Sequence, residues 1–407
     1  MGCCIHICTQ GVFSYDLHLR RGTQFHASWF KEIEVLKELE RLKDIMSRND
    51  LRSQSLDLLR FPLAVVVVAI HTFNINGFTI QGVPISLENM PVLLEINHVI
   101  NGFLRGQSVP IYFFISGFVF FFSLEGGKLT KEKYSQKLKN RVKTLLIPYL
   151  IWNIVAVLKR FFVRLPCFSS LFVNTNKAQL DFSLSAILET FWDDSKGIFI
   201  MPPTANEIVT NYTYPADTPL WFVRDLMIVV LCTPMLYWTL KRIRHYFVLT
   251  LGVLWFTLAY WDLGHINQLL TAFFFFSWGA YMSVNAKDMM HEFSRFSKIS
   301  MILYPLLALL FVFSEHYYPG LSDTIKRLNV LVGLFFAYNV SSWLLRHHIC
   351  KVSPLLASSS FFIYVAHYLM CDSFLKLFFF IFRPATDLGM LSIFVSAVVI
   401  TVTILWL

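Results

Sequence analysis

The chain has 407 residues, of which 56% are hydrophobic and 16% aromatic, and its mean hydropathy is +0.55. Only 15% are charged, against about a quarter in a soluble globular domain, so the composition excludes a soluble protein and indicates a membrane protein with several spans. The net charge of +9 does not indicate a nucleic-acid partner, because the basic residues form short clusters between apolar runs and no DNA-binding motif accompanies them.

Residues 1–50 differ in pattern from the rest of the chain. Between Trp29 and Met46, apolar and charged residues alternate as in an amphipathic helix, which would lie on the cytoplasmic membrane surface. The alternative is a true start at Met46, with residues 1–45 not translated. We expect a cytoplasmic segment, 1–50, followed by a membrane domain, 51–407, whose first span directs insertion without a cleavable signal peptide.

The first apolar run carries an arginine and a histidine. Arg60 and His71 are eleven residues apart, which at about 100° per residue places them within about 20° on one helix face and roughly 16 Å apart along it. Ionisable residues inside a membrane are costly and indicate a functional site. The alternative is structural: Arg60 would extend to the headgroups, and His71 would form a hydrogen bond between helices. Asp57, on the face of Arg60, could hold its guanidinium or simply favour the helix N-terminus.

About ten spans are expected at the length that a hydrocarbon core of roughly 30 Å demands, so we predict an all-α membrane protein. They are residues 56–73, 109–124, 145–162, 219–240, 247–261, 269–284, 299–313, 328–345, 361–382 and 388–407. With the N-terminus in the cytoplasm, the cytoplasmic loops carry about fifteen Lys and Arg residues, against about six outside. We therefore expect both termini in the cytoplasm, with Arg60 toward the inner side and His71 toward the outer side.

Two long outer loops are expected, at residues 74–108 and 164–218. Their polar and aromatic residues include Glu95, His98, Arg105, Trp192, Asp193, Asp194, Tyr212 and Tyr214. Rings that stack on a sugar and carboxylates that bind its hydroxyls would suit a glycan. The same aromatic residues would equally suit an interfacial belt, and Arg105 would meet either an acidic glycan or lipid headgroups. Asn211 begins a glycosylation sequon, which matters only in a eukaryotic secretory pathway.

Four further polar residues fall inside predicted spans. Arg224 and Asp225 are adjacent in sequence and so diverge by about 100° on a helix, which disfavours a pair between them. We expect them to line a cavity or to bond to other helices. Tyr364 and His367, one turn apart, could orient an acceptor or tie helices together. The seven cysteines show no metal-ligand spacing, so we expect no zinc site and no disulfide framework.

Four segments resemble the acyltransferase-3 family of integral-membrane O-acyltransferases. The first is the Arg60 and His71 pair, which matches the spacing of that family in its first helix. The second segment is Val-Pro-Ile-Tyr-Phe-Phe-Ile-Ser-Gly-Phe at 109–118. The third is the basic sequence Lys-Asn-Arg-Val-Lys-Thr-Leu-Leu-Ile-Pro-Tyr at 139–149. The fourth is the Ser…Tyr…His pattern at 359–367. The similarity covers roughly residues 53–407. Many members have two arginines three residues apart in the third segment, whereas here Arg141 is followed at that spacing by Thr144, and Lys143 or Lys139 would substitute with a point charge.

The resemblance implies transfer of an acyl group, usually acetyl, from cytoplasmic acyl-CoA to a hydroxyl of an extracytoplasmic glycan or a lipid-linked sugar. His71 would be the general base, and Arg60, with Arg141 and Lys143, would bind the donor. Asp57, Arg105, Arg224, Asp225, Tyr364 and His367 would surround the acceptor or the cavity. No bound cofactor or metal is expected. The expected location is the bacterial inner membrane, where the enzyme would modify an envelope polysaccharide.

Two other functional classes remain open. A transporter or flippase of a lipid-linked sugar would show similar charged cavity residues and aromatic outer loops, but it would leave its substrate unmodified. A sensory or interaction module with the same fold would not require both Arg60 and His71. Within the transferase class, the acyl group could pass directly or through an acyl-histidine.

Overall fold

The computed structural model describes residues 50–73, 79–80, 83–84, 90–124, 128–165, 179–200, 212–258, 261, 263–382, 384 and 386–407. The predicted amphipathic helix at 29–46, the possible start at Met46 and the Asn211 sequon lie outside these residues. By its contacts the chain divides into two units, Met1–Ser53 and Gln54–Leu407. The helical bundle belongs to the second unit.

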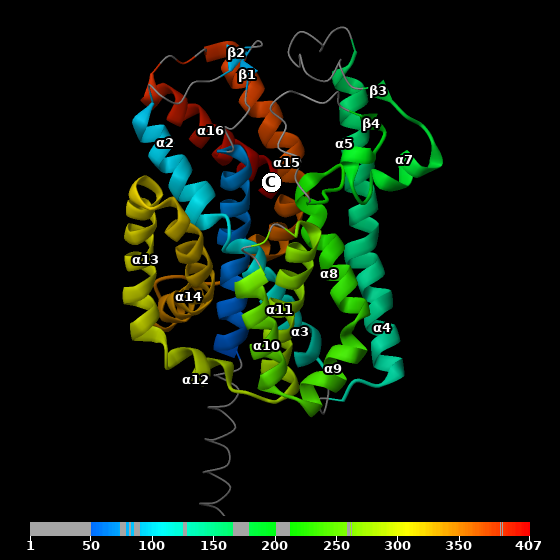
Figure 1. The fold of residues 1–407 in the computed structure, drawn as a ribbon, viewed down its shortest axis with the longest axis vertical. Helices are drawn as coiled ribbons and strands as arrows, with labels where there is room; N and C mark the ends of the chain where they lie inside the picture. Colours follow the sequence, from blue (N-terminus) through cyan, green and yellow to red (C-terminus); the bar gives the residue numbers. More distant parts are fainter. Residues whose placement is uncertain are drawn as a thin grey trace, which may run out of the picture. The chain divides into compact units, whose positions relative to one another are not determined.

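The described part of the chain is mainly helical (Figure 1). Its helices are the first helix (Asp50–Thr72), α2 (Pro91–Asn97), α3 (Ser108–Phe122), α4 (Lys131–Arg141), α5 (Ile147–Val163), α7 (Leu184–Glu189), α8 (Trp221–Leu231), α9 (Thr233–Arg242), α10 (His245–Leu258), α11 (His265–Val284), α12 (Met289–Ser294), α13 (Ser297–Tyr317), α14 (Pro319–Arg346), α15 (Pro354–Phe382) and α16 (Asp387–Trp406). Two antiparallel pairs of two-residue strands, β1 (Thr79–Ile80) with β2 (Val83–Pro84) and β3 (Gln179–Leu180) with β4 (Phe199–Ile200), complete it.

The expectation of an all-α membrane protein is confirmed, but the count of about ten spans is not. Within the described ranges, seven helices are long and apolar enough to cross a membrane, or eight if the bent pair α8 and α9 forms one span. The predicted spans 247–261 and 269–284 correspond to α10 and α11, and neither is among the seven. α10 has 14 residues, which is short of the roughly 20 that a hydrocarbon core requires.

Two predicted boundaries are wrong for identifiable reasons. The predicted span 219–240 breaks at Cys232, with a 61° bend between its halves. Pro234 lies in the first turn of α9, and a proline removes a backbone donor and clashes with the preceding turn.

The predicted outer loop 74–108 is helical from Pro91 onward, because α2, a π-helical turn at His98–Leu104 and α3 form one helical stretch, Pro91–Phe122. Asp387 of α16 accepts hydrogen bonds from the backbone N–H groups of Val92 and Leu93, at 2.8 and 2.9 Å, and so caps the start of this stretch.

The first helix lies at the centre of the bundle, between α13 and α14 on one side and α4 and α5 on the other (Figure 1). It packs through Ala64 and Val68 against Ile363 of α15 and Leu405 of α16. Ser341 of α14 donates a hydrogen bond to the carbonyl of Ser55 at 2.7 Å. Contacts on several sides hold this helix, and hence Arg60 and His71, in a fixed orientation.

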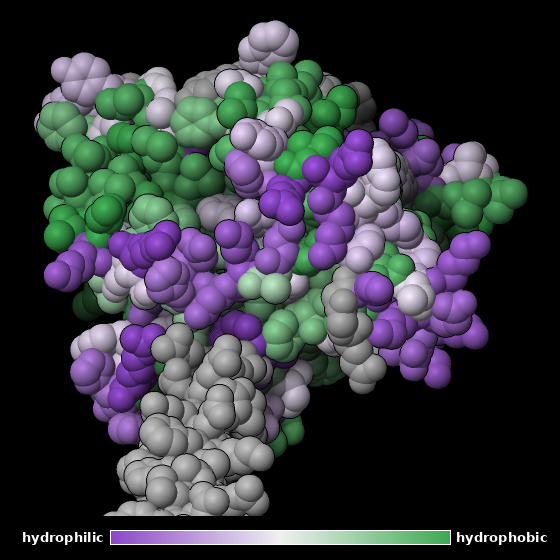
Figure 2. Space-filling model, turned by 90° about the horizontal axis from the view of Figure 1, so that it is seen from below, coloured by the Kyte–Doolittle hydropathy of each residue, from purple (hydrophilic) through white to green (hydrophobic). Residues whose placement is uncertain are grey.

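Apolar side chains on α5 and α13 face outward, as expected where lipid is the solvent. They include Ile151, Ile154, Leu158, Phe162, Ile302, Leu309 and Phe313. The basic helix α4, the end of α9 and helix α12 lie together at the lower end of the bundle in Figure 1. Figure 2, seen from that end, shows hydrophilic residues grouped across this face.

Candidate functional site

Arg60 forms an ion pair within its own helix. Its Nη1 lies 3.2 Å from Asp57 Oδ1, one turn earlier, and both side chains are about one third exposed (37% and 34%). The contact expected between these residues is therefore present. The hydroxyl of Tyr112, in α3, donates a hydrogen bond to the Arg60 carbonyl at 2.7 Å. Tyr112 belongs to the segment 109–118, but no role for it is predicted from the sequence.

A cavity of about 310 Å³ contains Arg60 and Arg141 in one wall, which is a volume typical of small-molecule sites. Its other lining residues are Tyr112, Ile115, Ser116, Val119, Leu145, Phe222, Leu226, Ala357, Ser358, Ser360, Phe361 and Tyr364. Arg141 is the last residue of α4 and precedes a π-helical turn, Val142–Leu146; such turns are frequent at functional sites. The cavity thus combines two fixed positive charges with mostly apolar walls.

The structure separates Lys143 from this cavity. Lys143 is exposed and is not among the lining residues, so its predicted role as a substitute for a second arginine has no geometric support. The physical reason is helical phase: Lys143 is two residues beyond Arg141, which turns it by about 200° to the other side of the helix.

His71 faces two aromatic residues of α15. The centre of its ring lies 5.2 Å from that of His367 and 5.4 Å from that of Tyr368. His367 is fully buried, and its Nδ1 lies 2.7 Å from the Tyr364 carbonyl oxygen and 3.2 Å from that of Ile363. A carbonyl only accepts, so Nδ1 carries the proton and donates it. The Nε2 of His367 has no hydrogen-bond partner among the residues that the structure describes.

Tyr364 connects the histidine pair with the arginine cavity. It lines the cavity, and its ring centre lies 6.1 Å from that of His367. Its hydroxyl donates to the carbonyl of Pro219, which fixes the ring against the start of α8. We call Arg60, Arg141, Tyr364, His367 and His71 together the connected site: the first three line the cavity, whereas the two histidines pack beyond Tyr364 and lie outside its lining.

Arg224 and Asp225 do pair, contrary to the prediction from sequence. Arg224 Nε lies 2.9 Å from Asp225 Oδ1, and His265 Nε2 lies 3.2 Å from the same oxygen. The Arg224 guanidinium stacks over Trp192 at 4.7 Å and donates to Thr213 Oγ1 at 3.0 Å. The 100° divergence applies where the side chains leave the helix, but the long arginine side chain bends back to its neighbour. This cluster ties the outer segment to α8, and neither residue lines the arginine cavity.

The remaining predicted residues lie apart from that cavity. Arg105 is in the helical stretch Pro91–Phe122, where its Nη2 donates to Asn101 Oδ1 at 2.8 Å. Glu95 pairs with His316 at 3.1 Å. Asp194 pairs with Arg160, so this acidic residue of the outer segment is already engaged by the protein.

One buried carboxyl group is not singled out by the sequence. Asp217, just before α8, is 0% exposed, and neither of its oxygens has a hydrogen-bond partner within the described part of the chain. Burial raises the pKa of Asp217 well above its usual value, although the positive charges of Lys159 and Arg160 partly oppose this. A lone aspartate in a predicted loop carries no sequence signal of such burial.

Comparison with known proteins places most of the chain in one family. Residues 53–407 match a family model described as an acyltransferase domain. No curated protein and no solved structure matches the chain. The matched region contains Arg60, Arg141 and the His71–His367 pair. Among the described residues, no group of three or more His, Cys, Asp and Glu side chains could hold a metal ion.

Proposed function

This chain belongs to the acyltransferase-3 family, and from that premise we propose that it is a membrane O-acyltransferase that uses acyl-CoA. The proposed donor is acetyl-CoA from the cytoplasm, and the proposed acceptor is a hydroxyl of an extracytoplasmic glycan or lipid-linked sugar. Family membership supports a membrane acyltransferase in general. The donor, the acetyl group and the acceptor are the proposal's own, as the resemblance to the family implies them, and the geometry of the site is compatible with them.

The connected site is the observation that carries the proposal. Arg60 and Arg141 share a cavity, and Tyr364 joins that cavity to the histidine pair. Guanidinium groups bind phosphate through charge-assisted, bidentate hydrogen bonds. The rise of about 1.5 Å per residue separates Arg60 from His71 by roughly 16 Å along the helix. An extended pantetheine arm would bridge this distance from a phosphate at the arginines to a thioester near His71.

His71 would act as the general base. An imidazole nitrogen of His71 accepts the proton of the acceptor hydroxyl while the hydroxyl oxygen attacks the thioester carbonyl carbon. The carbon–sulfur bond then breaks, and the proton passes to the leaving thiolate, which gives an ester and a free thiol. His367, whose Nδ1 donates to a backbone carbonyl, packs its ring beside that of His71 and supports its orientation.

Separate measurements of donor binding and transfer test the two roles. With the purified chain and acetyl-CoA, Arg60→Ala should raise the donor Kd about tenfold or more, because it removes a charge-assisted hydrogen bond. His71→Ala should leave that Kd within about twofold but lower the transfer rate by about 10²- to 10⁴-fold. Lys298→Ala removes an exposed charge that does not line the cavity, and it serves as the matched control. Equal donor affinity in wild type and Arg60→Ala would contradict the role given to Arg60.

Mass spectrometry of surface glycans distinguishes an acyltransferase from a transporter. In a deletion strain, an acyl mass should disappear from the glycan and return with the wild-type chain but not with His71→Ala. If the glycan is acylated normally in every strain while its surface amount falls in the deletion, the chain is a transporter of that glycan.

A further inference from the structure

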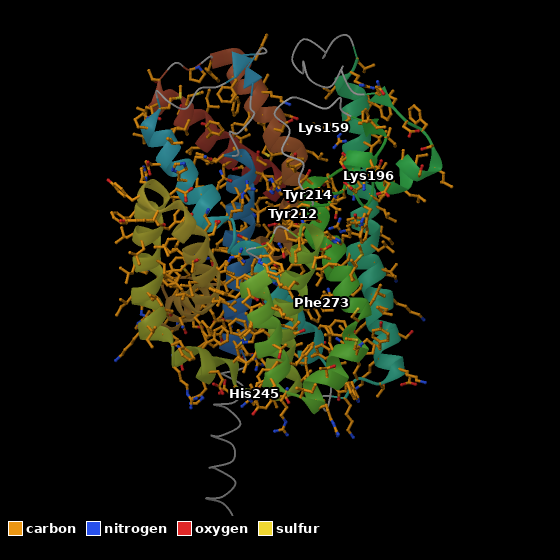
Figure 3. All side chains as sticks on the ribbon, viewed as in Figure 1. Lys159, Lys196, Tyr212, Tyr214, His245 and Phe273 are labelled. Carbon is orange, nitrogen blue, oxygen red and sulfur yellow. The ribbon has the colours of Figure 1, made fainter. Side chains whose placement is uncertain are left out.

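A second cavity, of about 290 Å³, lies among the start of α8, the end of α10, the start of α11 and α14. Figure 3 shows Tyr212 and Tyr214, which line it, on the opposite side of Phe273 from His245, the first residue of α10. The cavity is therefore remote from the basic end of the bundle. It shares no lining residue with the arginine cavity.

Aromatic side chains form much of the wall of this second cavity. Tyr212 and Tyr214 stack with ring centres 6.3 Å apart and an angle of 23° between their planes. Trp221 and Trp255 add two indole rings. The indole nitrogen of Trp255 donates to Thr271 Oγ1 at 3.0 Å. Its polar group is therefore already engaged, and Trp255 would contact a ligand through its apolar ring. Flat aromatic walls suit the apolar C–H face of a sugar ring.

Two amides at the start of α11 provide polar groups in the same cavity. Gln268 is 5% exposed, and its Oε1 has no hydrogen-bond partner among the described residues. Asn267 donates through Nδ2 to the Trp261 carbonyl at 2.9 Å, but its buried Oδ1 also lacks a partner in the described chain. A buried amide oxygen without a donor costs free energy. Hydroxyl groups of a bound ligand would satisfy both oxygens.

A basic side chain also lines the cavity. Arg327 of α14 is part of its wall. A bound ligand with an acidic group would thus lie beside the Arg327 guanidinium.

We propose that this cavity is the acceptor subsite and that it binds a saccharide carrying a carboxylate. The rings of Tyr212, Tyr214, Trp221 and Trp255 stack on the sugar, Gln268 and Asn267 accept hydrogen bonds from its hydroxyls, and Arg327 attracts the carboxylate. The inference rests on the proposed function, because it places the acceptor of that reaction. It adds the chemical class of the acceptor and the residues that select it.

Binding to the purified full-length chain tests the subsite without any transfer reaction. The probe is trigalacturonate, with maltotriose as the uncharged trisaccharide, and the signal is the change in the intrinsic tryptophan fluorescence of the chain, to which Trp221 and Trp255 contribute. We expect a saturable change with trigalacturonate and a Kd about tenfold higher for maltotriose. Gln268→Leu and Arg327→Gln should each raise the trigalacturonate Kd about tenfold. Tyr281→Ala, which alters a different aromatic cavity, should leave it unchanged.

Several outcomes would overturn the subsite. They are no saturable change with trigalacturonate, equal affinity in wild type and Gln268→Leu, or the same saturable signal from phosphatidylglycerol, which would make the cavity a lipid site. Thermal unfolding of each variant identifies those that fail to fold, and Gln268→Glu then replaces Gln268→Leu, because a carboxylate of nearly equal size should repel the ligand. Acetyl-CoA binding on the same preparations tests the proposed function separately, since it depends on Arg60.

Discussion

Burial without a partner makes Asp217 a residue whose ionisation opposes folding. Its pKa is raised by burial, so the folded chain holds a proton that the unfolded chain releases near pH 4. The stability contributed by the neutral group is fully present below the unfolded pKa and is lost as the pH rises through the folded pKa. This differs from the usual ion-paired aspartate, which stabilises the folded state at neutral pH.

The Asp217→Asn variant should therefore be more stable than the wild-type chain at higher pH, because the amide does not ionise. We expect equal free energies of unfolding for wild type and variant near pH 4 and a higher free energy of unfolding for the variant at pH 7, by about 1.4 kcal/mol for each unit by which the pKa is raised. Thermal unfolding of the purified chain between pH 4 and pH 8 measures this. Asp193→Asn, at a residue paired with exposed Lys196, is the control. A midpoint for Asp217→Asn that falls below wild type at pH 7 would contradict the interpretation.

At the scale of helices, the contact between α3 and α11 depends on two glycines. A Cβ atom on Gly279 would lie 2.0 Å from the backbone oxygen of Phe114, and one on Gly117 would lie 2.0 Å from that of Phe276. Each helix thus uses a glycine to bring the other backbone close, as small residues do in membrane helix pairs. Ser283 of α11 donates to the Phe118 carbonyl at 2.7 Å across the same contact. Because α3 carries Tyr112, this contact also positions one wall of the arginine cavity.

Gly279→Ala should separate these helices and destabilise the chain. The clash is with backbone, which cannot rotate away, so we expect a loss of about 1–3 kcal/mol or more. Lower unfolding midpoints and weaker acetyl-CoA binding would report it. Gly320→Ala is the matched control, because a Cβ there meets nothing within 4 Å. Equal midpoints for the two variants would show that the contact is looser than the structure has it.

For the molecule as a whole, the distribution of charge sets the orientation that the proposed reaction needs. The basic helix α4 and the ends of α9 and α12 lie at one end of the bundle, and the two tyrosines Tyr212 and Tyr214 lie away from it (Figure 3). Positive residues are retained on the cytoplasmic side. The arginine cavity would then open toward the cytoplasmic donor and the second cavity toward the outer acceptor.

Labelling of single cysteines tests this orientation. In a chain whose native cysteines are replaced by alanine, Lys133→Cys in α4 should react with a membrane-impermeant maleimide only after the cells are permeabilised. Lys196→Cys should react in intact cells, because the Lys196 side chain is 70% exposed at the opposite end of the bundle (Figure 3). The reverse labelling pattern would place the arginine cavity on the outer side and contradict a cytoplasmic donor.

The sequence by itself determined features that depend on local order along the chain. Composition and the length of the apolar runs established the helical membrane class, and helical phase placed Asp57 beside Arg60. The quoted segments were sufficient to indicate the family that residues 53–407 match. These features are local because backbone hydrogen bonds within a helix join residues only four apart, so spacing in the sequence fixes spacing in space.

Tertiary structure decided how residues distant in sequence meet. His71 faces His367 only because α15 packs against the first helix, and the start of α2 is capped by Asp387 from the far end of the chain. Arg224 and Asp225 pair because Trp192, Thr213 and His265 hold the guanidinium and the carboxylate in place. None of these contacts can be derived from periodicity, since each depends on which helix faces come together. The sequence determined which residues each helix presents, and the packing of the bundle decided which of them share a site.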